Sequence, residues 1–131
     1  MHSTQKEKAY HTILEAIEKS KSMFIVVEGR KDLQALIDLG FKRKNIFVLN
    51  NGNSIEKNIE KIIESSKRNQ VCILTDFDSE GKKLYRMIKR ELSKNGVKVN
   101  NKLRLQLLKE KISHIEGIAT FLKHYEFAIR K

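Results

Sequence analysis

Three short apolar runs recur along this chain of 131 residues, and each is followed by a segment long enough to form a helix. The runs cover residues 23–27, 46–49 and 71–74. None of them alternates between apolar and polar residues, and a continuous apolar run is typical of a strand that is buried on both faces. We therefore expect an α/β fold, in which helices flank both sides of a mainly parallel sheet.

A fourth, shorter strand is predicted at residues 97–99, which gives about four strands in the sheet. Apolar residues at helical spacing predict six helices. They cover residues 4–20, 31–39, 54–67, 79–94, 103–112 and 118–129. The third of these helices should begin with Asn53 as its N-cap and Glu56 as the second member of a capping box.

No proline, low-complexity tract or glycine-serine linker marks a domain boundary in the sequence. We therefore expect a single domain over residues 1–131. Its core should span about 20–100, with a helix at 4–20 before it and a basic helical extension at 101–131 after it.

The formal net charge of +11 is distributed unevenly along the chain. Residues 82–131 contain 14 lysines and arginines against 4 aspartates and glutamates, whereas residues 1–81 contain 13 against 12. A basic half beside a balanced half favours a polyanionic partner, most often nucleic acid. The alternative is that lysine-rich helix faces are simply solvated.

Cys72 is the single cysteine and has no partner for an internal disulfide. The first residues lack the apolar region of a secretory signal, and the longest apolar run is too short to cross a bilayer. We expect a cytoplasmic protein with no membrane partner.

Acidic residues follow the first and third predicted strands. Glu28 follows the first, and Asp76, Asp78 and Glu80 follow the third. Loops at the carboxyl ends of parallel strands converge, so these four carboxylates share one rim of the sheet if the two strands are neighbours. Clustered carboxylates repel one another, and a hard divalent cation such as Mg²⁺ offsets that repulsion. The alternative is that these acids cap helices or lie in loops.

Two other phosphoryl-transfer folds also place acids after strands, but neither fits this chain well. Haloacid-dehalogenase-type phosphatases normally carry Thr or Val two residues after the second Asp of their DxD motif, where this chain has Glu80. Receiver domains place an acid pair after the first strand, where this chain has only Glu28.

The segments IVVEGRKD at residues 25–32 and ILTDFDSEG at residues 73–81 resemble the two motifs of the Toprim domain. That domain is shared by type IA and type II topoisomerases, bacterial primases, OLD-family nucleases and the ribonuclease that matures 5S ribosomal RNA. The resemblance covers roughly residues 20–100, and the whole chain looks most like the small stand-alone Toprim proteins of archaea and bacteria. It implies a Rossmann-like Toprim fold.

The resemblance also implies roles for the acids. Glu28 would act as a general acid or base, or as a metal ligand, and Asp76 and Asp78 would hold Mg²⁺, or Mn²⁺ in its place. Glu80 matches a third acid of type IA topoisomerases and would join the metal site. No strand-cleaving, zinc-binding or helicase-binding region accompanies these motifs, which argues against a topoisomerase or a full primase.

A basic stripe on the predicted helix at 79–94 extends away from the acids. It comprises Lys82, Lys83, Arg86, Lys89 and Arg90, with Leu84, Tyr85, Ile88 and Leu92 on the opposite face. Such a stripe can follow a phosphate backbone, and Arg30 and Lys31 lie closer to the acids, where they can clamp a phosphate. The alternative is an ordinary solvated helix face.

Two further segments have less defined roles. The Asn50-Asn51-Gly52-Asn53 segment predicts a turn, in which Asn51 and Gly52 either line the crevice or serve the turn alone. Residues 113–117, which include His114, predict a break between two helices, and no chemistry is assigned to them.

These observations favour a Mg²⁺-dependent protein that cleaves phosphodiester bonds in nucleic acid, with RNA slightly favoured over DNA because the small maturation ribonucleases are the nearest functional analogues. Glu28, Asp76 and Asp78 are the expected catalytic residues. The first alternative is a non-catalytic module that binds metal and nucleic acid or a ribonucleoprotein partner, and a pairing of Glu28 with Arg30 would favour it. The second is a phosphatase of small esters, which a deep closed pocket would favour.

Overall fold

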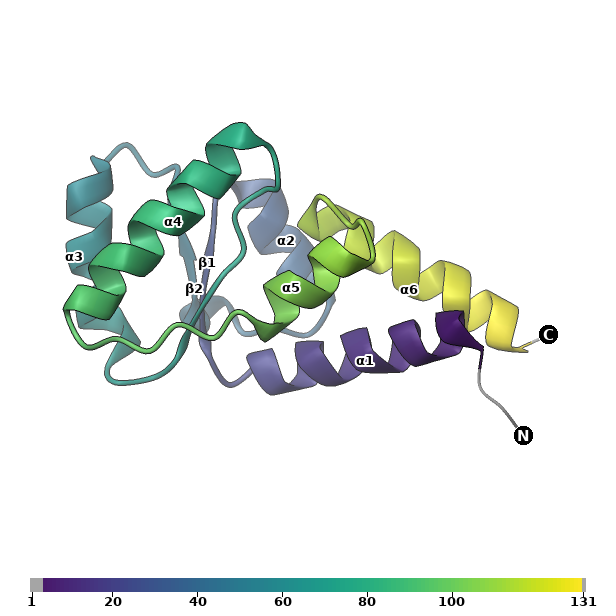
Figure 1. Cartoon of the computed structure of the whole chain (residues 1–131). Helices are drawn as coiled ribbons and strands as arrows, with labels where there is room; N and C mark the ends of the chain where they lie inside the picture. Colours follow the sequence, from purple (N-terminus) through teal and green to yellow (C-terminus); the bar gives the residue numbers. More distant parts are fainter. Residues whose placement is uncertain (1–3, 131) are drawn as a thin grey trace.

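The computed structural model describes the backbone of residues 4–130 and the side chains of residues 4–124 and 126. Residues 1–3 and 131, which the expectation of one domain includes, lie outside the described residues. Figure 1 shows the elements in their order along the chain: α1 (Gln5–Ser20), β1 (Phe24–Val27), α2 (Arg30–Asp38), η1 (Arg43–Asn45), β2 (Ile46–Val48), α3 (Ile55–Ser66), β3 (Val71–Ile73), α4 (Ser79–Lys94), α5 (Lys102–Lys109) and α6 (Ile115–Arg130).

The sheet has three strands in the order β2-β1-β3, and both neighbouring pairs are parallel. β1 lies in the centre, and all four of its residues are buried, as the continuous apolar run predicts. The α/β class and the parallel sheet are therefore confirmed. The arrangement also makes the first and third predicted strands neighbours, which brings their carboxyl ends together.

The fourth predicted strand is wrong within the described chain. Residues 97–99 contribute only an isolated parallel bridge between Val71 and Val99. Pairing stops there because the chain turns: the Asn100 side-chain oxygen accepts a hydrogen bond from the Lys102 amide at 3.1 Å, and α5 follows at once.

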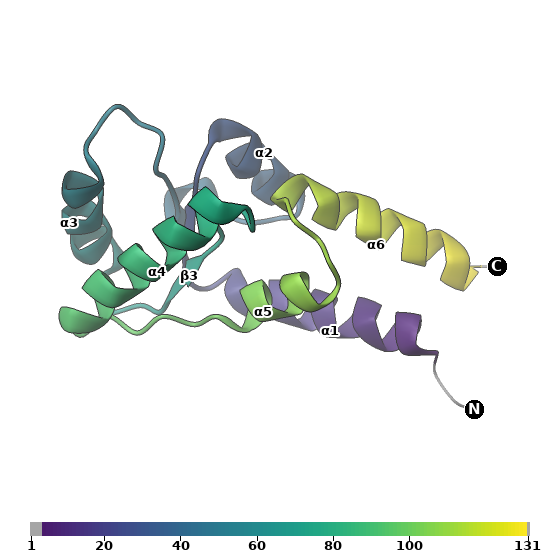
Figure 2. The same ribbon diagram turned by 45° about the horizontal axis from the view of Figure 1, so that its top comes forward.

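The two faces of the sheet are covered by different helices (Figures 1 and 2). Ile25 and Val27 of β1 face a core that includes residues of α1, α2, α5 and α6, whereas Phe24 and Val26 face a core that includes residues of α3 and α4. Successive residues of a strand point to opposite faces, so a short apolar strand supplies both cores. α1 and α6 pack together and extend past the sheet on the same side.

The predicted N-cap of α3 is wrong. Ser54, not Asn53, is the N-cap of α3, and its hydroxyl accepts a hydrogen bond from the Lys57 amide at 3.2 Å. The Asn53 amide instead donates to the Asn51 side chain at 3.0 Å, which keeps Asn53 in the preceding turn and removes the predicted capping box.

The break near the C-terminus also lies earlier than predicted. α5 ends at Lys109 and α6 begins at Ile115, because Ile115 and Ile118 are buried in the core and the Lys111 backbone has a positive φ of 57°. Between residues 4 and 130, no helix is long and apolar enough to cross a membrane.

Candidate functional site

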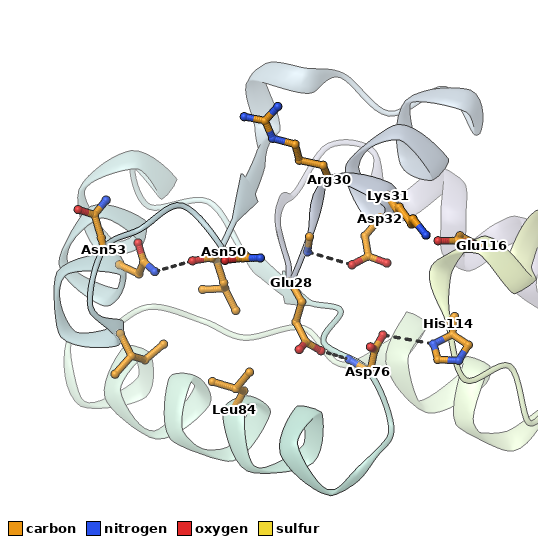
Figure 3. A pocket seen from close by; sticks show the side chains of 14 residues that line it. Glu28, Arg30, Lys31, Asp32, Asn50, Asn53, Asp76, Leu84, His114 and Glu116 are labelled. Carbon is orange, nitrogen blue, oxygen red and sulfur yellow. Dashed lines mark hydrogen bonds and ion pairs between the residues drawn. The ribbon is translucent and has the colours of Figure 1, made fainter.

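Glu28 and Asp76 meet at the carboxyl ends of β1 and β3. Each residue follows its strand closely, and the parallel pairing of the strands places both at the same edge of the sheet. The Asp76 backbone amide donates a hydrogen bond to Glu28 Oε2 at 2.6 Å (Figure 3). Two residues 48 positions apart in the chain are thus joined directly, as the order of the strands predicts.

The pKa of Glu28 is raised above the usual glutamate value. Burial of the half-exposed side chain is the main cause, and the negative charges of Asp76, Asp78 and Asp32 raise it further. The hydrogen bond from the Asp76 amide opposes the shift. Glu28 therefore takes up a proton more readily than an ordinary surface glutamate.

Asp78 and Glu80 follow Asp76 closely in the chain but are not among the residues that line the cavity beside Glu28 and Asp76. Asp78 is the N-cap of α4, and its Oδ1 accepts a hydrogen bond from the Gly81 amide at 2.7 Å. Glu80 is exposed in the first turn of the same helix. The capping interpretation thus holds for Asp78, although its charge lies near enough to affect the pKa of Glu28.

The loop between β3 and α4 is closely packed at Gly81. A Cβ on this residue would lie within 3.0 Å of three backbone atoms of Asp76, so no larger side chain fits without a shift. The buried hydroxyl of Thr75 donates to the Gly81 carbonyl at 2.7 Å and ties the two ends of the loop together. These contacts fix the backbone that carries Asp76.

Arg104 of α5 also supports this loop, and sequence reasoning gave it no role. Its side chain is only 5% exposed and donates to the Thr75 carbonyl at 2.6 Å, the Thr75 hydroxyl at 3.2 Å and the Asp76 carbonyl at 3.3 Å. A longer contact, at 3.4 Å, reaches the Ile73 carbonyl. One guanidinium thus connects the end of β3 to the C-terminal segment.

Two aromatic rings flank the same guanidinium. Its carbon atom lies 4.5 Å from the ring centroid of Phe77 and 4.3 Å from that of Tyr85, distances at which a cation is attracted to the ring face. Burial lowers the pKa of Arg104, while nearby ionisable groups that include Glu28 and Asp76 oppose the shift. Tyr85, predicted to face inward on its helix, is half-buried against this arginine.

A cavity of about 690 Å³ opens beside Glu28 and Asp76 (Figure 3). Its charged lining comes from the end of β1, the first turn of α2, the loop after β3, the α5–α6 loop and the first turn of α6, and the rest comes mainly from the β2–α3 turn and the start of α3. The lining residues are Glu28, Gly29, Arg30, Lys31, Asp32, Leu49, Asn50, Asn53, Ile55, Asn58, Asp76, Leu84, His114 and Glu116. The lining does not include Asn51 and Gly52, so of their two predicted roles the turn is the one that agrees with the structure.

The predicted basic residues are exposed, and two of them line this cavity. Arg30 and Lys31 line it from the first turn of α2, and no ion pair joins Glu28 to Arg30 in the part of the chain that the structure describes. The stripe on α4 is also exposed, and Ile88 and Leu92 on its opposite face are fully buried. The stripe comprises Lys82, Lys83, Arg86, Lys89 and Arg90.

His114 and Asp32 join the site without having been assigned to it from the sequence. His114 Nδ1 lies 3.6 Å from Asp76 Oδ1, although its side chain is 65% exposed. Asp32 Oδ2 accepts a hydrogen bond from the Gly29 amide at 3.1 Å, a capping arrangement at the start of α2. The Gly29-to-Asp32 spacing is a signal for Asp32, whereas His114 lies in a loop that has no sequence pattern of its own.

Glu28 and Asp76 have the donor chemistry that Mg²⁺ prefers. This ion takes oxygen ligands and commonly uses one or two carboxylates, with water and phosphate oxygens completing its shell. Among the described residues, no three His, Cys, Asp or Glu side chains surround one point, so a closed all-protein metal cage is not present there. The carboxylate pair provides the oxygen donors of an open magnesium site, and no cysteine lines the cavity to supply the sulfur ligands common at structural zinc sites.

Known proteins resemble this chain over much of its length. UPF0292 protein MJ1624 of Methanocaldococcus jannaschii is 27% identical over 124 residues, which cover 92% of this chain and 94% of that protein. UPF0292 protein TV1259 of Thermoplasma volcanium is 46% identical over 63 residues, which cover 48% of this chain and 50% of that protein.

A solved structure and a family model agree on the fold. A protein from Aquifex aeolicus has a TM-score of 0.68 and 29% sequence identity, and the match covers 82% of this chain and 94% of that one. The family model described as Toprim-like matches residues 25–111, which span β1 to the end of α5 and include Glu28, Asp76 and Asp78. The chain therefore belongs to the Toprim-like family.

Proposed function

We propose that this protein binds Mg²⁺ at Asp76, uses Glu28 as a general acid and hydrolyses phosphodiester bonds in nucleic acid, with RNA as the first substrate to examine. The direct contact between Glu28 and the Asp76 backbone, at the edge of an open cavity, carries this proposal. Arg30 and Lys31 line the same cavity as the two carboxylates, which supports a role for these cations in binding the substrate phosphate. Mn²⁺ has the same ligand preference and is expected to replace Mg²⁺.

Glu28 supplies the acid in this reaction. Its Oε2 accepts the Asp76 amide hydrogen, which leaves Oε1 free to bind a proton, and burial together with the neighbouring acids raises the pKa of Glu28 and so favours the protonated form. A water oxygen forms a bond to phosphorus, the bond from phosphorus to the leaving oxygen breaks, and the leaving oxygen takes the proton from Glu28. The proton lost by the attacking water passes to solvent. Bound Mg²⁺ would stabilise the charge that develops on the phosphate and lower the pKa of the attacking water.

The exposed cations of α4 support a long anionic substrate over a small phosphate ester. Lys82, Arg86 and Lys89 lie on the outer face of the helix that begins directly after Asp78. α4 begins close to Asp76 and runs away from the strand ends (Figure 2), so a long nucleic acid that extends from the cavity has the cations of this helix nearby. Contacts of this kind position a phosphate backbone and carry no base sequence information.

Cleavage of labelled RNA and DNA with Mg²⁺ tests the proposal. Asp76→Asn should lower the cleavage rate by at least about 100-fold, because it removes a charged ligand while keeping the side-chain shape. Asp38→Asn changes an exposed aspartate at the end of α2 and should leave the rate unchanged. Undiminished cleavage by Asp76→Asn would overturn the proposed site.

A non-catalytic binding module is the second candidate, and the positions of Asp78 and Glu80 favour it. Asp78 caps α4 through its Oδ1, and neither Asp78 nor Glu80 is among the residues that line the cavity. Calorimetric titration with Mn²⁺ separates the two functions when combined with the cleavage assay. Metal binding that is lost in Asp76→Asn, without cleavage of any nucleic acid by the wild type, would support the binding module.

A further inference from the structure

We propose that the part of the cavity formed by the β2–α3 turn binds the base of an unpaired nucleotide whose phosphate lies at Glu28 and Asp76. This inference rests on the proposed function and assigns a substrate feature to the same site. It concerns a nucleotide within a strand and gives a role to the Asn50-Asn51-Gly52-Asn53 segment, which the proposed chemistry does not use.

The lining of the cavity changes in character from one side to the other. One side is ionic and includes Glu28, Asp76 and Arg30, which suit a metal ion and a phosphate. The other side carries amide and aliphatic groups, contributed by Leu49, Asn50, Asn53, Ile55, Asn58 and Leu84. A surface that bound only a phosphate backbone would need further cations there, whereas a nucleobase needs polar edges beside apolar contact area.

Internal hydrogen bonds fix the shape of the β2–α3 turn. The buried Asn58 side chain donates to the Leu49 carbonyl at 3.0 Å and accepts a hydrogen bond from the Asn51 amide group at 2.9 Å. Asn51 also donates to the Val48 carbonyl at 3.0 Å and accepts from the Asn53 backbone amide at 3.0 Å. Asn51 and Asn58 are thus committed to building the turn.

Asn50 and Asn53 have the same side chain as Asn51 and Asn58, but their side chains do not build the turn. Both line the cavity and are exposed, and neither uses its side-chain amide in a hydrogen bond with any residue that the structure describes (Figure 3). The backbone of Asn50 is held to the acidic side, because its amide donates to the Glu28 carbonyl at 2.9 Å. Two uncommitted amide groups therefore lie on a rigid turn beside the acids.

An asparagine amide offers one donor group and one acceptor, which matches the paired donor and acceptor edges of a nucleobase. In a duplex the Watson–Crick edges are occupied, whereas unpaired bases can be splayed out and bound on those edges. The cavity volume of about 690 Å³ lies within the range of small-molecule sites. A cavity of this size accommodates one nucleotide together with its phosphate. The ligand is therefore a single-stranded segment, a loop or a frayed end.

Binding to a strand with and without bases tests the inference. Affinity is measured by fluorescence anisotropy for a short single-stranded oligonucleotide and for a fully abasic strand of the same length, with Ca²⁺ replacing Mg²⁺ to prevent cleavage. The wild type should bind the strand with bases about tenfold more tightly. The Asn50→Ala/Asn53→Ala variant should lose most of this preference and keep its affinity for the abasic strand.

Asn45→Ala is the matched control, because Asn45 precedes β2 and lies at the opposite end of that strand. It should retain the full preference. Equal affinity of the wild type for the two strands would overturn the base site, as would a loss in the double variant that is equal for both. A free nucleoside monophosphate that competes as tightly as the oligonucleotide would also overturn it. The proposed cleavage is judged separately by Asp76→Asn, so either proposal can fail alone.

Discussion

The site is assembled from two regions that differ in how their residues act. The strand-end turns contribute half-buried carboxylates, Glu28 and Asp76, which are held mainly by backbone groups. The α5–α6 segment contributes a fully enclosed cation, Arg104, and an exposed imidazole, His114. The first region provides the acids of the candidate site, and the second supports and borders them.

The C-terminal segment therefore supports the site from inside the protein as well as providing a basic surface. Arg104 is counted in the excess of positive charge over residues 82–131, yet it is buried and binds carbonyl groups of this chain. The exposed cations of α4, in contrast, are available to a polyanion, as are exposed lysines elsewhere in the segment such as Lys98 and Lys102. A count of charges along a sequence combines these two uses, and burial separates them.

Removal of the Arg104 guanidinium should have the largest effect on the stability of the protein. Arg104→Met keeps much of the apolar stem but withdraws the donors to Thr75 and Asp76 and the cation between two rings. We expect the free energy of unfolding to fall by about 3 kcal/mol, because buried carbonyls lose their partners. Urea denaturation measures this change.

Arg104→Lys and Arg90→Met sharpen the result. The lysine retains a charge and some donors but not the planar guanidinium, so about half of the lost stability should return. Arg90 is exposed on α4 near Glu91, and its replacement should change the unfolding free energy by less than about 0.5 kcal/mol.

If Arg104→Met lowered Mn²⁺ affinity and Arg104→Lys restored it, Arg104 would be a positioning residue for Asp76. Equal stability of the Arg104→Met and Arg90→Met variants would break the distinction between buried and exposed cations.

Gly81→Ala should have the second-largest effect, and it acts on the strand-end region alone. The added Cβ would overlap the Asp76 backbone, which the Thr75 and Asp78 side chains hold in place through Gly81. We expect a loss of about 2 kcal/mol in the free energy of unfolding and weaker metal binding. Calorimetry and urea denaturation measure the two quantities.

Gly29→Ala is the control for this change. Gly29 has an extended backbone with φ −138°, and the nearest atom to an added Cβ is Asp32 Oδ2 at 3.9 Å. Its unfolding free energy should stay within about 0.5 kcal/mol of the wild type. A Gly81→Ala protein that was as stable as this control would show that the loop can move away from Asp76 without cost.

His114→Gln should affect activity more than stability. The imidazole is largely exposed, so the unfolding free energy should change by less than about 0.5 kcal/mol. It also lies 3.6 Å from Asp76 Oδ1, and loss of a group that orients a metal ligand typically costs at least about tenfold in activity or metal affinity. We expect a tenfold decrease in Mg²⁺-dependent cleavage, whereas His11→Gln on α1 should have no effect. Equal rates for the two variants would confine His114 to a surface role.

The parts of this structure that could be predicted from sequence are those with local patterns. The parallel sheet follows from three continuous apolar runs, and the meeting of Glu28 with Asp76 follows from strand order and polarity. The basic face of α4 follows from helical spacing, which also predicts the burial of Ile88 and Leu92.

The parts that could not be predicted depend on contacts between distant segments. An arginine in a short basic helix has the same local pattern whether it faces solvent or, as Arg104 does, a carbonyl 29 residues away. Asn53 and Ser54 are both good N-cap residues, and only the Asn51 hydrogen bond decides between them. The predicted strand at residues 97–99 is cut short by the Asn100 turn, which apolar content alone does not reveal.

The smallest expected effect concerns Asp32, whose pKa is raised above the usual aspartate value. Burial is the main cause, the charges of Asp76 and Glu116 add to it, and the Gly29 amide and His114 oppose it. A carboxyl whose pKa is higher in the folded state binds more protons there than in the unfolded chain, so its ionisation lowers stability as pH rises. That loss of stability is absent below the ordinary aspartate pKa range and complete above the raised pKa.

Asp32→Asn keeps a side-chain oxygen that can accept a hydrogen bond from the Gly29 amide and removes the titration. The wild type should therefore lose stability relative to Asp32→Asn as pH increases through this window, in urea denaturation measured from acid to neutral pH. A difference of opposite slope would mean that the charge of Asp32 is favourable in the folded protein, as expected for an acid in the first turn of a helix, and that the hydrogen bond from Gly29 outweighs burial and the neighbouring acids.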